Sequence, residues 1–253
     1  MRGEIASLYR YPVKGFSPEP LSYADLTLGC YFPHDRLYAV ENGPSGFDPA
    51  APAHVAKSRF TVLAQIPEVA AIRTRYDDGM FQAEREGRGG VSADLTTDAG
   101  RIALAAWLES TMDPEHLRGP LKVVQAPGHR FMDHPEGYVS IVNLASVEAL
   151  GRGMGAALDP LRFRANVYVS GWPAWVENDW PEGTPLTLGD AQTTVFKPIV
   201  RCAATHVDPT TAVRDADVME ALYRLEGHLF CGIYVRVRSD GQIRPGDAVE
   251  AQP

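Results

Sequence analysis

The sequence predicts a β-rich α+β fold built around β-barrels, with a few short helices. Short strand-like runs separated by Gly, Pro and Asp dominate the first 90 residues, and only three later segments show a helical apolar period. Many short strands with few helices are typical of barrels. The 253 residues are enough for one large core or two small ones.

The predicted strands are runs rich in β-branched and aromatic residues that end at turn-forming residues. The stretch 43–52, rich in Gly, Pro and Ala, predicts an exposed loop. We expect strands at Glu4–Tyr9, Ser22–Leu28, Arg36–Glu41, Thr61–Gln65, Ala70–Arg75, Asp190–Arg201 and Gly232–Arg238.

Three helices are predicted, each beginning near a capping side chain and ending at proline or glycine. Their ranges are about 97–112, 143–151 and 215–226. Apolar spacing places Ile102 and Leu108 on the inner face of the first helix, and Val218 and Leu225 on that of the third.

Composition excludes several classes of function. The net charge of -8 argues against nucleic acid or an anionic membrane as a partner. Three widely spaced cysteines form no C-x-x-C pair, which argues against a zinc ribbon and fits a reducing compartment. The N-terminus has no apolar signal core, and no stretch approaches a membrane span of about 20 residues. We expect a soluble cytoplasmic protein.

The segment from Arg162 to Val169 alternates between polar and apolar residues, which predicts a strand. One face would then carry Arg162, Arg164 and Asn166 in a line. Two guanidiniums and an amide suit an elongated anion, because the arginine fork matches phosphate oxygens. A solvated outer face would show the same pattern.

Two further segments offer cations for such an anion. Lys14 and Gly15 follow the first predicted strand, where lysine gives a point charge and glycine lets backbone N–H groups approach a ligand. Arg36 opens another strand and adds a third arginine. A plain turn and a surface ion pair between Asp35 and Arg36 are the ordinary alternatives.

Cys202 lies where a β-branched run breaks into polar residues. Thiolate is a soft ligand and a strong nucleophile, so the position suits a soft metal or covalent sulfur chemistry. On residue type alone, packing as a small hydrophobe is the commoner role. Strand alternation turns Arg201 away from the thiol. Residues just beyond could supply hydrogen bonds or a proton; these are Thr205, His206 and Asp208.

Tyr234, in another predicted strand, could point its hydroxyl into a pocket or to the surface. No motif near Cys30 or Cys231 suggests a functional role, so we expect both cysteines to be structural. There is no P-loop, no G-x-S-x-G elbow and no H-E-x-x-H motif.

Taken in order and spacing, these segments resemble the MOSC superfamily, most of all the bacterial relatives of the mitochondrial amidoxime-reducing component. The resemblance implies an N-terminal MOSC β-barrel region at residues 1–118 and a MOSC domain at 119–253. It rests on Tyr11-Pro12-Val13-Lys14, Asp35-Arg36, Arg162 to Asn166, Arg201-Cys202, Val207-Asp208-Pro209, Gly232-Ile233-Tyr234 and Ile243 to Asp247.

The resemblance implies a molybdenum cofactor (Mo-molybdopterin) with Cys202 as the protein ligand of the metal. Lys14, Arg36 and Arg164 match positions that hold the pterin phosphate and ring. Further cofactor contacts are expected from Gly15, Asn143, Arg162, Asn166, Thr205 and Tyr234. The sequence departs from the family pattern at Gly15, Ala165, His206 and Ala212, where Ser, Pro, Thr and Gly are usual.

The resemblance also implies an oxidoreductase that removes oxygen from small N-hydroxylated substrates, with Cys202, His206 and Asp208 as catalytic residues. No cysteine-rich tail follows Asp247, so we expect electrons from a separate donor protein of ferredoxin, flavodoxin or cytochrome type. Two alternatives stay open. The chain could transfer sulfur through a persulfide on Cys202, or it could carry the molybdenum cofactor without catalysis.

Overall fold

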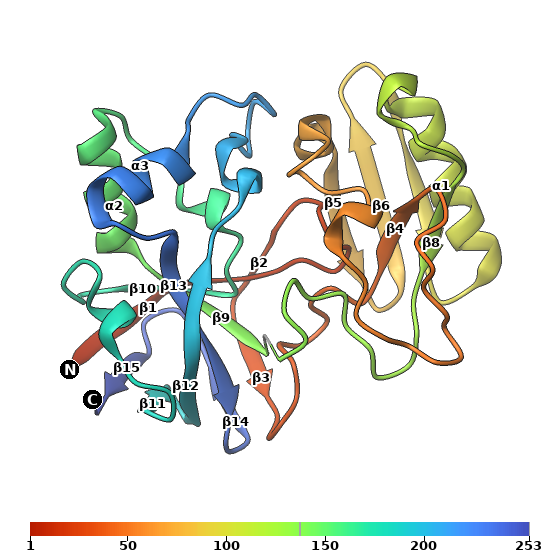
Figure 1. The fold of residues 1–253 in the computed structure, drawn as a ribbon. Coiled ribbons are helices and arrows are strands. Elements are labelled where there is room, and N and C mark those ends of the chain that lie inside the picture. The colour runs from red at the N-terminus through yellow and green to blue at the C-terminus, as the bar shows by residue number, and fades with distance from the viewer. Residues whose placement is uncertain (137, 253) are drawn as a thin grey trace.

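The computed structural model describes residues 1–136 and 138–252, which form two lobes (Figure 1). One lobe is a closed seven-stranded barrel in the order β10-β9-β13-β12-β11-β15-β1, closed by pairing of β10 with β1. Only the pairing of β9 with β10 is parallel. The barrel strands are β1 (Arg2–Arg10), β9 (Val139–Asn143), β10 (Val167–Ser170), β11 (Pro185–Leu188), β12 (Ala191–Val200), β13 (Phe230–Val237) and β15 (Ala248–Ala251).

Apolar side chains from alternate positions of the barrel strands fill the barrel interior. Ile5, Val195 and Val235 belong to one buried apolar cluster and point inward, since successive side chains of a strand face opposite sides. The barrel prediction is confirmed. Short strands accompany it, namely β2 (Glu19–Leu21), which extends β1, and the pair β3 (Ala24–Leu26) with β14 (Gly241–Ile243).

Two helices pack beside this barrel, α2 (Leu144–Met154) and α3 (Val218–Glu226). The Asn143 side chain caps α2 by accepting a hydrogen bond from Ala145 N, and α3 ends at Gly227 in the left-handed conformation. Both helices lie where they were predicted. Leu225 is half-exposed, so the prediction that it faces inward is wrong.

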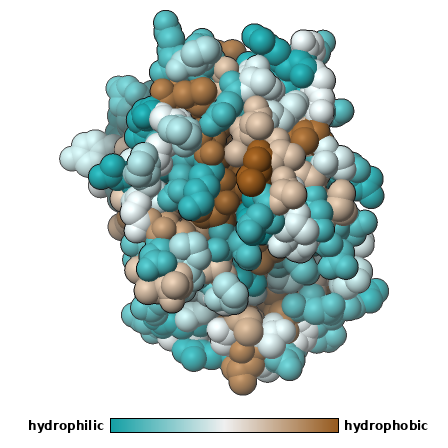
Figure 2. Space-filling view, turned by 90° about the vertical axis from the view of Figure 1, so that its right-hand side faces the viewer, coloured by the Kyte–Doolittle hydropathy of each residue, from teal (hydrophilic) through white to brown (hydrophobic). Residues whose placement is uncertain are grey.

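The second lobe contains the remaining sheets and α1 (Asp98–Thr111). Thr97 caps α1 and Leu108 is buried, as predicted, but Ile102 is 68% exposed and lies outside the apolar stripe. The outer face of this lobe is hydrophilic around its edges and carries a group of apolar side chains in its upper middle (Figure 2). Its strands are β4 (Ala39–Asn42), β5 (Arg73–Asp77), β6 (Met80–Arg85), β7 (Gly89–Asp94) and β8 (Leu121–Val124).

Two strand predictions are wrong, and two more begin too early, because Arg36 is left-handed before β4 and residues 67–71 form a 3-10 turn before β5. The stretch 61–65 forms turns after Phe60, which makes a single bridge to Glu41. Residues 160–163 form a 3-10 turn and Arg164 is left-handed, so the strand begins only at Val167. The 3-10 turns are η1 (Lys57–Arg59), η2 (Pro67–Ala71), η3 (Pro114–His116), η4 (Pro160–Phe163), η5 (Val176–Asp179) and η6 (Ala203–His206).

The start of the chain packs with the barrel. Ile5, Leu8, Leu26 and Phe32 share the apolar cluster of residues 139–251. The division near residue 118 therefore remains a prediction about sequence segments. Residues 5–8 and 24–32 pack with the barrel, whereas Val13 and Phe16 pack in the apolar cluster of the second lobe. Among the described residues, no helix combines the length and apolar character needed to cross a bilayer.

Candidate functional site

A cavity of about 330 Å³ lies where residues of both lobes meet, at the lower end of the usual size range for ligand pockets. Three of the chain's four lysines and four arginines line it, against one carboxylate, in a protein of net charge -8. The ionisable wall residues are Lys14, Arg36, Lys57, Asp133, His134, Arg162, Arg164, Lys197, Arg201, Cys202 and Tyr234.

Cys202 is the thiol that reaches this cavity. It follows β12 in extended conformation, precedes η6 and is partly exposed. Cys231 is fully buried, and burial raises the pKa of its thiol to about 12. Cys30 is exposed and is not part of the cavity wall. Among the described cysteines, Cys202 alone combines access to a ligand with a cationic surrounding.

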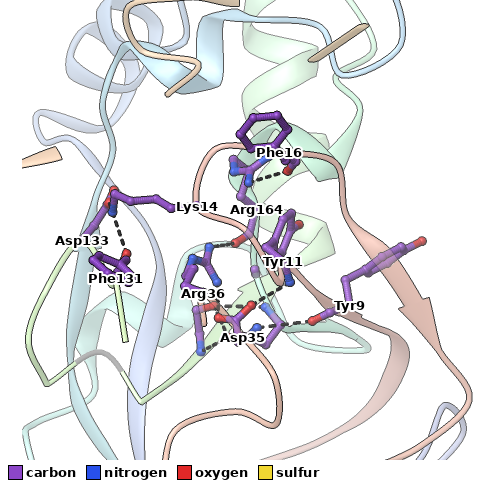
Figure 3. A network of polar contacts seen from close by, with 12 residues as sticks. Tyr9, Tyr11, Lys14, Phe16, Asp35, Arg36, Phe131, Asp133 and Arg164 are labelled. Atoms are coloured by element: carbon purple, nitrogen blue, oxygen red, sulfur yellow. Dashed lines mark hydrogen bonds and ion pairs between the residues drawn. The ribbon is translucent and has the colours of Figure 1, made fainter. Parts of the chain in front are cut away.

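Two arginines lie close to one aromatic ring, that of Tyr11 (Figure 3). The Arg36 Cζ lies 4.7 Å and the Arg164 Cζ 4.3 Å from the centroid of the Tyr11 ring. Arg36 pairs with Asp35, whereas Arg164 donates to the Phe16 carbonyl at 2.8 Å. Burial, and then the neighbouring charge of Arg36, lowers the pKa of Arg164. The pair of guanidiniums is therefore suited to an anion.

Backbone strain accompanies these arginines. Arg36 has φ 47° and Arg164 φ 52°, both in the left-handed region that non-glycine residues seldom adopt. Such strain concentrates at functional sites, where the surrounding structure holds it. The Arg36 Nη2 donates to the Arg164 carbonyl at 3.0 Å and joins the two strained positions.

A buried lysine and a carboxylate form another part of the cavity wall. Lys14 is 4% exposed, and its Nζ donates to the Phe131 carbonyl at 2.8 Å and to Asp133. Burial lowers the pKa of the Lys14 ammonium. Burial also favours a protonated Asp133, but the charges of Lys14 and Lys57 outweigh it and hold the pKa of Asp133 well below its usual range.

Lys57 joins this wall to the thiol. Its Nζ lies 3.2 Å from Asp133 Oδ2, and Lys57 and Cys202 both line the cavity. Burial favours the neutral amine, but Asp133 and Cys202 outweigh burial and raise the pKa of Lys57. Lys57 therefore brings a positive charge from η1 of the second lobe to the cysteine.

Arg162 lines the cavity but is already neutralised. Its guanidinium pairs with Asp208 at 2.8 Å and Asp215 at 2.7 Å, and its side chain is 3% exposed. The expectation that Arg162, Arg164 and Asn166 share one strand face is wrong, because the 3-10 turn and the left-handed Arg164 precede β10.

His206 and Asp208 lie outside the cavity wall. His206 Nε2 is 3.3 Å from Asp217 Oδ1 and accepts from Met219 N at 3.4 Å, so the ring faces the start of α3. Asp208 accepts from Thr210 N and Thr211 N as well as from Arg162. This geometry gives neither side chain a place beside the thiol.

Asn143 and Asn166 also serve the fold. Asn143 caps α2 and donates to Glu177 at 2.9 Å, and Asn166 accepts from Ser140 Oγ at 2.8 Å. Both are completely buried, and neither belongs to the cavity wall. The structure therefore does not bring these two amides to the predicted ligand.

Gly15, Thr205 and Tyr234 do line the cavity. Gly15 has φ +92°, and an added Cβ would lie 2.5 Å from the Thr61 carbonyl oxygen. Position 15 thus requires glycine, because the backbone at Thr61 packs too closely to leave room for a side chain. The Thr205 hydroxyl donates to the Cys202 carbonyl at 2.9 Å and closes the turn that presents the thiol.

Arg201 turns away from the thiol and donates to the carbonyls of Cys231 and Phe163, each at 2.7 Å. Sequence reasoning missed the wall residues Lys57, Asp133, His134 and Lys197. The rarity of lysine was a usable signal, since the chain has only four.

Comparison with known proteins adds two family matches. The MOSC N-terminal beta barrel domain matches residues 2–113, and the MOSC domain matches residues 128–250. A molybdenum cofactor sulfurase from Caenorhabditis briggsae is 30% identical over 98% of this chain and 35% of its own length. The mitochondrial amidoxime-reducing component 1 of Mus musculus is 28% identical over 43% of this chain and 35% of its own length.

The chain thus spans about a third of the length of these curated relatives. Among solved structures, the YUAD protein from Bacillus subtilis aligns over 99% of this chain and 96% of its own, with a TM-score of 0.49 and 15% identity. That likeness is too weak to support a functional argument.

Proposed function

Because the chain belongs to the MOSC superfamily, with a MOSC N-terminal beta barrel domain followed by a MOSC domain, we propose that it is a molybdenum-cofactor-dependent oxidoreductase that reduces N-hydroxylated compounds. The observation that carries the proposal is the free Cys202 thiol on the wall of a cavity with seven lysine and arginine side chains and one carboxylate. Relatives named for amidoxime reduction support the substrate class.

The residues present fit such a cofactor. A thiol is a soft ligand suited to a transition metal, and it must lose its proton to bind. Arg164 and Lys14 offer cationic donors for a phosphate, and Tyr11 keeps the guanidiniums in place. When bound, the molybdenum cofactor would supply the redox centre that takes oxygen from the substrate.

The protein's own groups then have separate tasks. Cys202 would hold the metal, while Lys14, Arg36 and Arg164 would orient the anionic cofactor. Lys57, beside both Cys202 and Asp133, is the titratable group best placed to stay charged near the thiol. Electrons would come from a separate donor protein.

Sulfur transfer is the second candidate, because the sulfurase match spans 98% of this chain, against 43% for the amidoxime-reducing component of Mus musculus. It predicts a persulfide on Cys202 and no molybdenum. Intact mass spectrometry separates the two, since a persulfide adds one sulfur atom to the thiol.

The proposed reductase is tested by turnover. Protein purified from a host that makes the molybdenum cofactor should reduce benzamidoxime to benzamidine when dithionite-reduced methyl viologen supplies electrons. Stoichiometric molybdenum without turnover of any N-hydroxylated compound would contradict the proposal.

A further inference from the structure

Lys197 is a cavity cation that forms no ion pair with the described residues. Arg36, Arg162, Lys14 and Lys57 form ion pairs, and the remaining two arginines of the cavity wall donate to backbone carbonyls. Within residues 1–136 and 138–252, no hydrogen bond or ion pair reaches the Lys197 ammonium. It lies 5.3 Å from the centroid of the Phe196 ring.

An irregularity in the pairing of β12 with β13 places Lys197 on the cavity wall. The register shifts between Val195 and Lys197, so that Lys197 pairs with Tyr234 of β13, and both residues line the cavity. β-Bulges commonly re-aim side chains next to functional sites. Lys197 lies five residues before Cys202, about 16 Å along an extended chain.

The wall around Lys197 is aromatic. The His134 ring lies 5.3 Å from the Phe196 ring and 6.3 Å from the Tyr234 ring, and His134 and Tyr234 also line the cavity. The cavity wall thus combines the Cys202 thiol, aromatic rings and the Lys197 ammonium. A flat molecule that carries an anionic group matches this combination.

We propose that Lys197 is a specificity-determining residue that binds an anionic group of the substrate. The site then prefers N-hydroxylated compounds that carry a carboxylate or similar anion over neutral ones. This inference rests on the proposed function and names its substrate class. In the reaction, two electrons and two protons break the N–O bond, form an N–H bond and release water, with reduced methyl viologen as the electron source in the test.

The test compares benzamidoxime with para-carboxybenzamidoxime. The variant is Lys197→Gln, and the matched control is Lys122→Gln, because Lys122 is the one lysine outside the cavity wall and is exposed on β8. The ratio of kcat/KM for the carboxylate to kcat/KM for the neutral compound should fall about tenfold in Lys197→Gln, as expected for loss of a charge-assisted contact. The ratio should not change in Lys122→Gln.

A binding measurement separates failure of this inference from failure of the proposed function. Calorimetry should show that para-carboxybenzamidoxime binds the oxidised protein more weakly after Lys197→Gln, and that added salt weakens binding to the wild type more than to the variant. If neither compound is reduced but this difference appears, the reductase proposal fails and the anion site stands. Equal ratios and equal binding would overturn the inference, as would loss of molybdenum from Lys197→Gln, which would assign the lysine to the cofactor.

Discussion

The Arg162 guanidinium forms an ion pair with Asp208, with Nη2 and Oδ2 2.8 Å apart. This pair joins η4, which precedes β10, to the loop that follows the cysteine turn. Asp215 adds a second carboxylate at 2.7 Å. The contact fixes the segment after Cys202 to the part of the cavity wall that Arg162 forms, so it positions the site.

We predict that Arg162→Met lowers the free energy of unfolding by about 2–4 kcal/mol, because it strands carboxylates that a buried arginine neutralises. Arg236→Met is the control, since its partners Glu136 and Glu182 are half-exposed and the loss should stay below about 1 kcal/mol. Urea unfolding measures both. Equal losses would show that the Arg162 pairs add nothing beyond a surface contact.

Gly15→Ser should destabilise the protein by about 1–3 kcal/mol, because a Cβ at φ +92° would lie 2.5 Å from the Thr61 carbonyl oxygen. Gly46→Ser is the control, since Gly46 has a similar φ of +82° and no atom within 4 Å of the added Cβ. Thermal unfolding should show the larger loss at Gly15. A smaller loss there than at Gly46 would refute the close contact.

Glu68 should contribute to acid unfolding. Burial favours its protonated form, but hydrogen bonds from His116, the Asp113 backbone and Arg85 outweigh burial and lower its pKa from 4.5. A carboxyl group whose pKa is lower in the folded protein than in the unfolded chain stabilises the fold at pH values above the unfolded-chain pKa. This stability is lost as the pH falls through the pKa of the folded protein.

The Glu68→Gln variant should therefore lose about 1–3 kcal/mol of unfolding free energy at pH 7, and the loss should shrink as pH falls below 4.5. Urea titrations at several pH values measure it, with exposed Glu86→Gln as the control. A loss independent of pH would mean that the ionised carboxylate is not what stabilises this region.

Arg164→Met should reduce the pterin and molybdenum content of purified protein about tenfold, because it removes a guanidinium that lines the cavity and pairs with no carboxylate of the described residues. Arg152→Met on the surface of α2 serves as the control. Unchanged cofactor content in a folded Arg164→Met variant would show that Arg164 does not bind the anionic cofactor.

Local sequence signals predicted much of the fold. Caps and stops at Thr97, Asn143 and Gly227 placed all three α-helices, because these effects act within one turn. The alternation of polar and apolar residues at 162–169 predicted a strand that begins too early. Residues 160–163 instead form a 3-10 turn, in which Arg162 pairs with Asp208. Period-two spacing cannot reveal such long-range pairing.

The site was only partly predictable for the same reason. Lys14, Arg36, Arg164 and Cys202 line the cavity as expected, whereas His206 and the predicted asparagines have partners elsewhere. Lys57 reaches the cysteine from 145 positions away in the chain, through the packing of two lobes. No pattern within either segment encodes that contact.

The most direct test of the account is the molybdenum and pterin content of wild-type protein, Cys202→Ala and Cys30→Ala, each purified from a host that makes the cofactor. We expect near-equal molybdenum in the wild type and Cys30→Ala, since Cys30 is exposed away from the cavity, and a large loss in folded Cys202→Ala. Equal molybdenum in all three proteins would show that the Cys202 sulfur is not the metal ligand.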